Sequence, residues 1–269
     1  MKTKVCVAVL LIAGIVSACN THIKHSPAAI TKDTLAYSMQ KLVRAQKCVQ
    51  KADSTCLKVT ISYPQFKTDT ALNDTLARKV CGLFAFDKST PADIKQLPDY
   101  FQNFRDESKM DKEVKGRPPV QFELNIKALV LRQDSDLTTL QVDGYTFQGG
   151  AHGSSLTRFI NWNPKTHKPL TLDDILKNGY WAELNQTGEH IFRHDEKLNE
   201  TASLARDYFF KDAKFSLSRN YSITPVGIRF VYNENEIKPY AAGKTDLLIP
   251  YKQITTLLKP NTVIKQYLK

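Results

Sequence analysis

The sequence predicts an α+β protein in which helices pack against one side of antiparallel sheets. Runs of alternating apolar and polar residues, typical of half-buried strands, recur along the chain. Stretches with apolar residues at helical spacing are grouped between these runs instead of following each of them, which favours α+β over a parallel α/β sheet. The chain has 269 residues, enough for a substantial hydrophobic core.

The first residues are interpreted as an export signal and not as part of the fold. Lys2 and Lys4 precede a run of twelve apolar residues, 5–16. This run is too short to span a bilayer, because a spanning helix needs about 20 residues. Small residues then lead to Cys19. The pattern resembles a bacterial lipoprotein signal peptide of residues 1–18, after which Cys19 would become the lipidated first residue. An ordinary secretory signal cleaved nearby is the alternative.

The predicted lipid anchor, of the kind that carries palmitate, would hold the protein at the cell envelope. Asn20 follows the cysteine, which in a Gram-negative bacterium resembles a signal for the outer membrane, with the protein on its periplasmic face. Residues 19–35 are largely polar and include Pro27, so they are predicted to form a tether between the lipid and the fold.

Besides Cys19, three cysteines remain after removal of the signal, and an oxidising compartment predicts one disulfide and one buried free thiol among them. Cys48 and Cys56 are expected to pair, because residues 51–54 read as a turn that would bring two strand ends together. Cys81 lies in an apolar helical run and is expected to be a small core residue. No two cysteines are separated by two residues, so these thiols predict no metal site.

The folded part is predicted to begin with a long hairpin. Residues 37–49 and 55–66 both show strand-like alternation, and Pro64 is expected to end the second strand. Apolar residues at helical spacing then predict a helix over 70–86. Residues 51–54 are predicted to form the turn of this hairpin.

A second helix is predicted to start with Thr90 as its capping residue and Pro91 at its first position. Its apolar residues continue to Phe104, and Pro98 is expected to bend the helix or divide it. Both helices need a sheet to cover. The later predicted elements are strands over 120–131, 138–147 and 155–162, a short helix over 170–176 capped by Thr171, a helix over 180–197, and strands over 221–224, 227–232 and 246–249.

A glycine-rich segment, 144–153, joins two of these predicted strands. Its four glycines predict a backbone with positive φ, or a close approach of another segment that leaves no room for a side chain. His152 lies among them and has two interpretations. As a functional residue it would act as a general base or ligand beside a loop that offers backbone amides to an anion. As a structural residue it would hydrogen-bond a neighbouring carbonyl and fix the turn.

Several short motifs, taken in their order along the chain, carry a resemblance to one known family. The motifs are CLKVTISYP (56–64), GGAHG (149–153), NWN (161–163), LTLDDI (170–175), GIRFVY (227–232), IKPYAAG (237–243) and IPY (249–251). In this order they resemble the exported domains of unknown function found in RsiV-type anti-sigma factors, which act as lysozyme receptors, and in the non-catalytic N-terminal region of PdaC-type peptidoglycan deacetylases. Stand-alone bacterial lipoproteins are also members.

The resemblance covers residues 37–258 and implies an α+β fold in two interlocked subdomains. The N-terminal, PdaC/RsiV-like subdomain would comprise residues 36–117, and the C-terminal, RsiV-like subdomain would comprise residues 118–269. No established activity comes with this family.

Two loops of the resemblance are predicted to form one binding surface. The first contains Tyr145, Gly149, Gly150 and His152, and the second is the turn at Tyr240, which follows a proline and precedes a strand. The alternative is that the two loops pack on each other for structural reasons only.

No catalytic or metal site is predicted. His190 and His194 stand four residues apart on one helical face with Asp195 adjacent, a geometry that can hold zinc. The glutamate of an HExxH motif is missing, however, and a solvated helix face explains the set. No serine lies in a G-x-S-x-G elbow, and no Ser/His/Asp set can be assigned, so enzymatic activity is not expected.

The formal net charge of +11 falls to +9 once Lys2 and Lys4 leave with the signal. The basic residues are spread along the chain without interleaved aromatic residues, which argues against a nucleic-acid partner. Anionic partners of the envelope, such as phospholipid, lipopolysaccharide, teichoic acid or the carboxylates of peptidoglycan, fit this charge better. Host lysozyme is itself strongly basic, so long-range electrostatics oppose its capture unless a local acidic patch dominates.

The sequence therefore predicts a lipid-anchored envelope protein that binds peptidoglycan or a wall-active protein such as lysozyme. It predicts contact with the membrane through the lipid, and no cofactor. The alternative hypothesis is a peptidoglycan-modifying enzyme that uses His152 in the glycine-rich loop.

Overall fold

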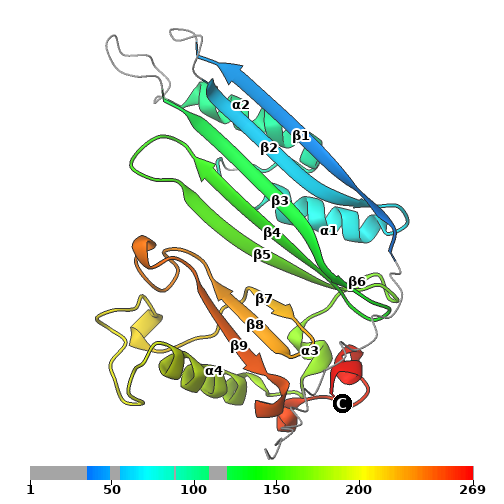
Figure 1. The fold of residues 1–269 in the computed structure, drawn as a ribbon, viewed down its shortest axis with the longest axis vertical. Helices are drawn as coiled ribbons and strands as arrows, with labels where there is room; N and C mark the ends of the chain where they lie inside the picture. Colours follow the sequence, from blue (N-terminus) through cyan, green and yellow to red (C-terminus); the bar gives the residue numbers. More distant parts are fainter. Residues whose placement is uncertain (1–34, 49–54, 88, 109–119, 269) are drawn as a thin grey trace, which may run out of the picture.

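The computed structural model describes residues 35–48, 55–87, 89–108 and 120–268. Within these ranges the chain forms two sheets that lie side by side, each covered by helices (Figure 1). The predicted signal peptide, the lipidation residue Cys19 and the predicted tether up to residue 34 lie outside the described residues. In the described part, no helix combines the length and the apolar composition that crossing a membrane requires.

The larger sheet has the strand order β1-β2-β3-β4-β5-β6. Its neighbouring strands are antiparallel except β2 and β3, which run parallel because the chain crosses over through helices between them. The α+β fold is confirmed, and the one parallel pair is a feature that the sequence analysis did not predict. The strands are β1 (Tyr37–Lys47), β2 (Thr55–Phe66), β3 (Phe122–Gln133), β4 (Thr138–Phe147), β5 (Ser154–Asn163) and β6 (Lys168–Pro169).

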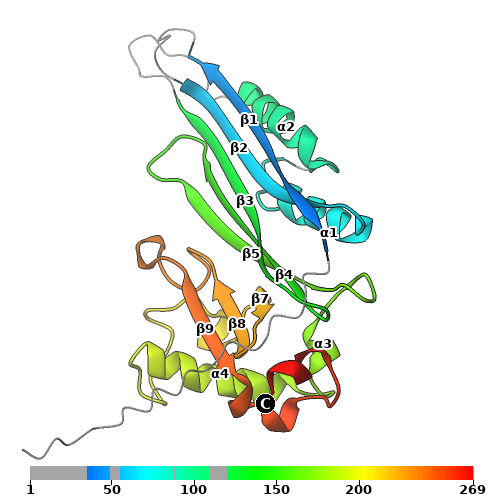
Figure 2. The same cartoon turned by 45° about the vertical axis from the view of Figure 1, so that its right-hand side comes forward.

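Helices α1 (Thr70–Cys81) and α2 (Leu97–Glu107) cover one face of this sheet (Figure 2). Asp69 caps α1, because its Oδ1 accepts a hydrogen bond from the backbone N–H of Leu72 at 3.0 Å. The prediction that this helix continues to residue 86 is wrong. The chain leaves the helix at Gly82, a poor helix former, and Leu83 and Phe84 fill the same core from outside the helix.

The second helical segment begins later than predicted. Asp93, and not Thr90, is the capping residue, because its side chain accepts a hydrogen bond from the N–H of Lys95 at 2.9 Å at the start of η1 (Ile94–Gln96). Pro98 stands in the first turn of α2, where its missing N–H leaves no helical bond unmade. The proline thus divides the segment into η1 and α2, one of the two outcomes that the sequence predicts.

The hairpin of β1 and β2 forms as predicted, but Pro64 does not end its second strand. Pro64 pairs with Met39, and β2 continues to Phe66. On its other side β2 pairs with β3 only as far as Ser62. Beyond that point one edge of β2 has no strand partner, so a residue without an N–H is tolerated there.

The predicted disulfide between Cys48 and Cys56 is present, and it joins the two strands of this hairpin with a Cα–Cα distance of 4.9 Å. Cys81 is a free, buried thiol, also as predicted. Burial, with a smaller contribution from the charge of Asp93, raises the pKa of the Cys81 thiol to about 11. The thiol is therefore neutral and unreactive at physiological pH.

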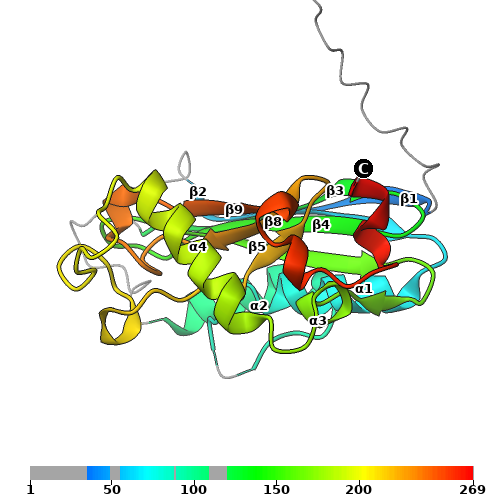
Figure 3. The ribbon, with the colours of Figure 1, turned by 90° about the horizontal axis from the view of Figure 1, so that it is seen from below.

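The smaller sheet contains β7 (Tyr221–Ile223), β8 (Gly227–Tyr232) and β9 (Thr245–Pro250), all antiparallel. Helix α4 (Trp181–Asp195) crosses this sheet, as the view from below shows (Figure 3). The preceding short helix α3 (Leu172–Ile175) begins as predicted at Thr171, which forms a capping box with Asp174. These elements confirm the late helices and strands of the sequence analysis to within a few residues.

Two hydrophobic cores divide the described chain near β6. One core draws its residues from between Leu35 and Trp162, and the other from Leu137 and from residues between Leu170 and Ile264. The predicted boundary between residues 117 and 118 lies outside the described residues, and strands from both sides of it, β1 to β6, are hydrogen-bonded into a single sheet. We therefore call residues 35–169 the first unit and residues 170–268 the second unit.

The second unit completes the outer edge of β5 with side chains instead of a strand. The backbone N–H groups of alternate β5 residues donate to Glu234, Asn233 and Asn220. The bonds are Ser155 N to Glu234 Oε2 at 3.2 Å, Thr157 N to Asn233 Oδ1 at 2.6 Å, and Phe159 N to Asn220 Oδ1 at 3.2 Å. Asn220 also donates to the carbonyl of Thr157 at 2.8 Å. The backbone groups of this edge are thereby satisfied where no strand covers them.

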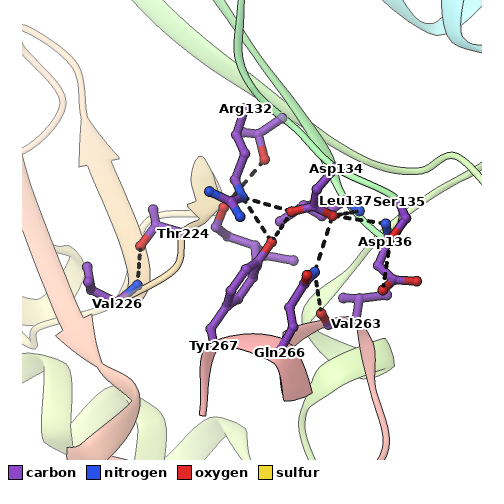
Figure 4. Close-up of polar contacts among 12 residues, drawn as sticks. Arg132, Asp134, Ser135, Asp136, Leu137, Thr224, Val226, Val263, Gln266 and Tyr267 are labelled. Carbon is purple, nitrogen blue, oxygen red and sulfur yellow. Dashed lines mark hydrogen bonds and ion pairs between the residues drawn. The ribbon is translucent and has the colours of Figure 1, made fainter. Parts of the chain in front are cut away.

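The C-terminal helix η7 (Val263–Tyr267) is tied to the β3–β4 turn by a cluster around Asp134 (Figure 4). The Asp134 side chain is fully buried. Its Oδ2 accepts from Arg132 Nε at 2.9 Å and from the Tyr267 hydroxyl at 2.5 Å, and its Oδ1 accepts from Gln266 Nε2 at 3.2 Å. The same Oδ1 takes the turn amides of Asp136 and Leu137, each at 2.9 Å.

Burial alone would raise the pKa of Asp134, but the hydrogen bonds from Tyr267, the two turn amides and Gln266 outweigh it and lower the pKa. Burial and the bond to Asp134 raise the pKa of Tyr267. The cluster therefore holds a carboxylate and a neutral phenol at physiological pH.

Replacing Asn233 by Ala is expected to lower the free energy of unfolding by about 1–3 kcal/mol, because the buried N–H of Thr157 loses its acceptor. Urea unfolding of both proteins measures this change. Asn125→Ala, at an exposed position of β3, is the matched control and should stay within about 0.5 kcal/mol of wild type. Equal stabilities of the two variants would contradict the role of the side-chain edge.

Asp134→Asn is expected to lower the free energy of unfolding by about 3 kcal/mol at pH 7, because Arg132 and Tyr267 lose a buried carboxylate partner. Because the pKa of Asp134 is lower in the folded than in the unfolded protein, its ionised form stabilises the fold above the unfolded-state pKa of about 3.9. This stabilisation is lost as the pH falls through the folded-state pKa. The difference in the free energy of unfolding between wild type and Asp134→Asn should therefore become smaller below about pH 4.

Unfolding by urea at pH 7 and pH 3 measures the effect. Asp136→Asn removes a partly exposed carboxylate of the same turn, which pairs with Lys165 at the surface, and serves as the control. A pH-independent difference between wild type and Asp134→Asn would contradict the assignment.

Candidate functional site

The glycine-rich loop connects β4 to β5 and has the backbone that its glycines predict. Gly149 has φ of 84° and Gly150 has φ of 99°, values that side-chain-bearing residues rarely adopt. At Gly153 the ring of Tyr145 lies where a Cβ would be. Gly149 and Gly150 thus form the turn, and Gly153 lets the loop pack closely against the ring of Tyr145.

The loop meets the turn at Tyr240, a contact that both interpretations of the two loops, a binding surface and purely structural packing, require. The imidazole of His152 stacks on the ring of Tyr240 with centroids 4.1 Å apart and an interplanar angle of 16°. Tyr240 begins η4 (Tyr240–Ala242), which follows Pro239. The Nδ1 of His152 lies 3.0 Å from the carbonyl oxygen of Gly153, the kind of contact expected of a residue that fixes a turn. The two loops therefore form one continuous surface, which we call the paired-loop surface.

A polar pocket of about 390 Å³ lies beside the paired-loop surface. Tyr145 lines it together with the ammonium groups of Lys127 and Lys244. Its two carboxylates already accept hydrogen bonds: Asp143 from the Thr157 hydroxyl at 2.7 Å, and Glu234 from the N–H of Ser155 at 3.2 Å. The pocket thus presents two lysines, an aromatic ring and several amide groups to a ligand. The remaining lining residues are Asn125, Gly144, Ser155, Leu156, Thr157 and Asn233.

The helical histidines form separate surface pairs. His190 Nδ1 lies 2.8 Å from Glu200 Oε1, and His194 Nδ1 lies 3.2 Å from Asp195 Oδ1. Among the described residues, no group of three or more histidine, cysteine or acidic side chains is arranged to hold a metal ion. His152, for its part, has the carbonyl of Gly153 and the ring of Tyr240 as its partners.

A second, larger cavity of about 710 Å³ lies between the two units, and the sequence analysis did not identify it. Its basic residues come from three distant segments: Lys79 from α1, Arg158 from β5, and Lys211 and Arg219 from the chain between α4 and β7. We call this cavity the basic cleft. No spacing along the sequence could have found it, because it exists only when the two units are docked.

Comparisons with known families agree with the division into two units. Residues 50–155 match the family described as deacetylase PdaC, and residues 173–252 match a protein family of unknown function, DUF3298. The first match lies within the first unit and the second within the second unit.

The chain is also similar to individual proteins. The chain is similar to the immunogenic proteins MPB64 of Mycobacterium bovis and MPT64 of Mycobacterium tuberculosis, each with 23% identity over 176 residues, which is 62% of this chain and 73% of the relative.

Two solved structures share the fold. A DUF3298 family member from Bacteroides fragilis has a TM-score of 0.68 at 23% identity and covers 88% of this chain and 99% of its own. A DUF3298 family protein from Pseudomonas aeruginosa has a TM-score of 0.65 at 21% identity and covers 86% of this chain and 96% of its own. Residues 50–155 therefore form a PdaC-like region and residues 173–252 a DUF3298 domain of unknown function, in agreement with the resemblance that the motifs carry.

Proposed function

We propose that this protein is a lipid-anchored component of the cell envelope that binds peptidoglycan through the paired-loop surface. The observation that carries the proposal is the stacked pair of His152 and Tyr240, which lies beside a polar pocket. The outer face of a stacked ring can accept the apolar face of a sugar, and nearby amide and ammonium groups can bind its hydroxyl and carboxylate groups.

The net charge of the whole protein favours peptidoglycan over lysozyme as the partner. Lys127 and Lys244 line the pocket without a carboxylate partner in the described part of the chain, and peptidoglycan carries carboxylates. The pocket also contains the carboxylates of Asp143 and Glu234, which accept hydrogen bonds from neutral groups and balance the two lysines in formal charge. A strongly basic partner would meet a protein with a formal net charge of +11 before processing.

The lipid anchor rests on the N-terminal sequence. Lys2 and Lys4, the apolar run and the small residues before Cys19 support cleavage and lipidation at that cysteine. The PdaC-like region belongs to an exported family, which supports an envelope location.

Cys19→Ala is expected to abolish lipid attachment, because the thiol that receives the lipid is gone. The variant should lose its membrane association on fractionation, and a labelled fatty acid should no longer be incorporated. Ser17→Ala, two residues earlier, leaves the thiol in place and serves as the control. A Cys19→Ala protein that still fractionates with membranes, processed at the same site, would refute the anchor.

His152→Ala and Tyr240→Ala are each expected to weaken binding to purified peptidoglycan about tenfold or more, because either change removes half of the stacked pair. A sedimentation assay at physiological salt measures this binding. His194→Ala, at an exposed helical position, is the matched control and should bind like wild type.

Three results would contradict the proposal. Binding that disappears at physiological salt would be a non-specific attraction between a basic protein and an anionic polymer. Saturable binding to lysozyme in a parallel assay, with none to peptidoglycan, would assign the surface to a wall-active protein. New muropeptide products that vanish in His152→Ala would establish the enzymatic alternative.

A further inference from the structure

The basic cleft is a second candidate binding site, built at the junction of the two units. It shares no lining residue with the polar pocket beside the paired-loop surface. Its volume of about 710 Å³ lies within the usual range of small-molecule sites, about 300–1,000 Å³. The inference about the basic cleft therefore does not rest on the function proposed for the paired-loop surface.

Two of the cations in the cleft are partly withdrawn from water and lie close to each other. Lys79 and Arg158 are both half-buried. Burial and the neighbouring charge of Arg158 lower the pKa of Lys79, as expected when two like charges share a confined space. At physiological pH this arrangement costs stability unless an anion offsets it.

Lys79 and Arg158 lack the carboxylate partners that other buried cations have in the described part of the protein. Arg105, Arg132 and Arg193 are also withdrawn from water, and each pairs with an acidic side chain. In the described ranges, by contrast, Lys79 and Arg158 make no ion pair with a carboxylate.

The other charged groups that line the cleft do not supply the missing anion. Arg219 adds a third positive charge, and its guanidinium is held over the ring of Trp181 at 4.2 Å. Lys211 adds a fourth, exposed at the rim. The lining acid, Glu236, accepts from the N–H of Asn233 at 2.8 Å and from the Ser218 hydroxyl at 3.3 Å.

The cleft also offers an exposed aromatic surface. The side chain of Phe209 lines it and is 55% exposed, unlike the neighbouring Phe210, which belongs to the second core. An exposed phenylalanine in a polar cleft provides an apolar face for a ring. Cations that lack a counter-charge and a free aromatic face together fit a ligand that has both a negative group and a sugar ring.

We propose that the basic cleft binds an anionic saccharide, with its carboxylate or phosphate between Lys79 and Arg158 and its sugar ring against Phe209. Charge-assisted hydrogen bonds from the two cations would supply most of the affinity. Because the cleft is lined by both units, binding would also hold the units together.

The test uses the protein expressed from the full chain and isothermal titration at about 0.15 M salt. Four probes separate the features of the ligand: trigalacturonate carries carboxylates, glucose 1-phosphate carries a phosphate, maltotriose is a neutral saccharide, and inorganic phosphate lacks a sugar. We expect one or both anionic saccharides to bind, and maltotriose and inorganic phosphate to bind about tenfold more weakly or not at all. The two anionic probes show which acid group the cleft prefers.

Lys79→Met and Arg158→Gln should each weaken binding of the anionic saccharide about tenfold or more. Lys41→Met, at an exposed position of β1, is the matched control and should bind like wild type. Without ligand, the Lys79→Met protein should melt at the same temperature as wild type or at a higher one, because one of two like charges has been removed. This measurement shows that a loss of binding is not caused by a loss of folding.

Three results would overturn the proposal. They are the absence of binding to both anionic saccharides, wild-type affinity in Lys79→Met and Arg158→Gln, and inorganic phosphate binding as tightly as the saccharides. Peptidoglycan binding that survives in Lys79→Met but is lost in His152→Ala would show that the two sites act separately.

Discussion

The outer edge of β5 is the constraint on which the arrangement of both units depends. A strand edge with open amides pairs readily with other strands, and most sheets cover or interrupt such edges. Here the acceptors come from Asn220, Asn233 and Glu234, which flank the hairpin of β7 and β8 at its open end, opposite the turn. A shift of the second unit along β5 would leave several buried amides without acceptors at once, so one docking position is strongly preferred.

Both candidate sites take their geometry from this junction. β5 begins two residues after His152, and Glu234 lies six residues before Tyr240, so the bonds between β5 and the second unit bring the two rings together. At the other end of the contact, Arg158 alternates with the β5 residues that bind Asn220, and Arg219 precedes Asn220. Neither unit alone contains the paired-loop surface or the basic cleft.

Features set by local sequence could be predicted, whereas features set by docking could not. The limits of β4, the capping of α3 by Thr171 and the turn at Gly149 and Gly150 all follow from neighbouring residues. The end of α1 was misjudged because Leu83 keeps the helical spacing although it packs from a loop. The parallel pairing of β2 with β3 and the cations of the basic cleft depend on residues far apart in the chain, and periodicity carries no signal for them.

The side-chain edge of β5 also sets an order of events during folding. A chain made from its N-terminus produces all six strands of the larger sheet before Asn220 or Glu234 exists. The growing protein therefore passes through a stage with a formed sheet and an uncovered β5, the stage at which a second copy could pair with that strand. Once the segment with β7 and β8 has been made, the side chains of Asn220, Asn233 and Glu234 bind the edge of β5. They then prevent a second copy from pairing with β5, in addition to fixing the position of the second unit.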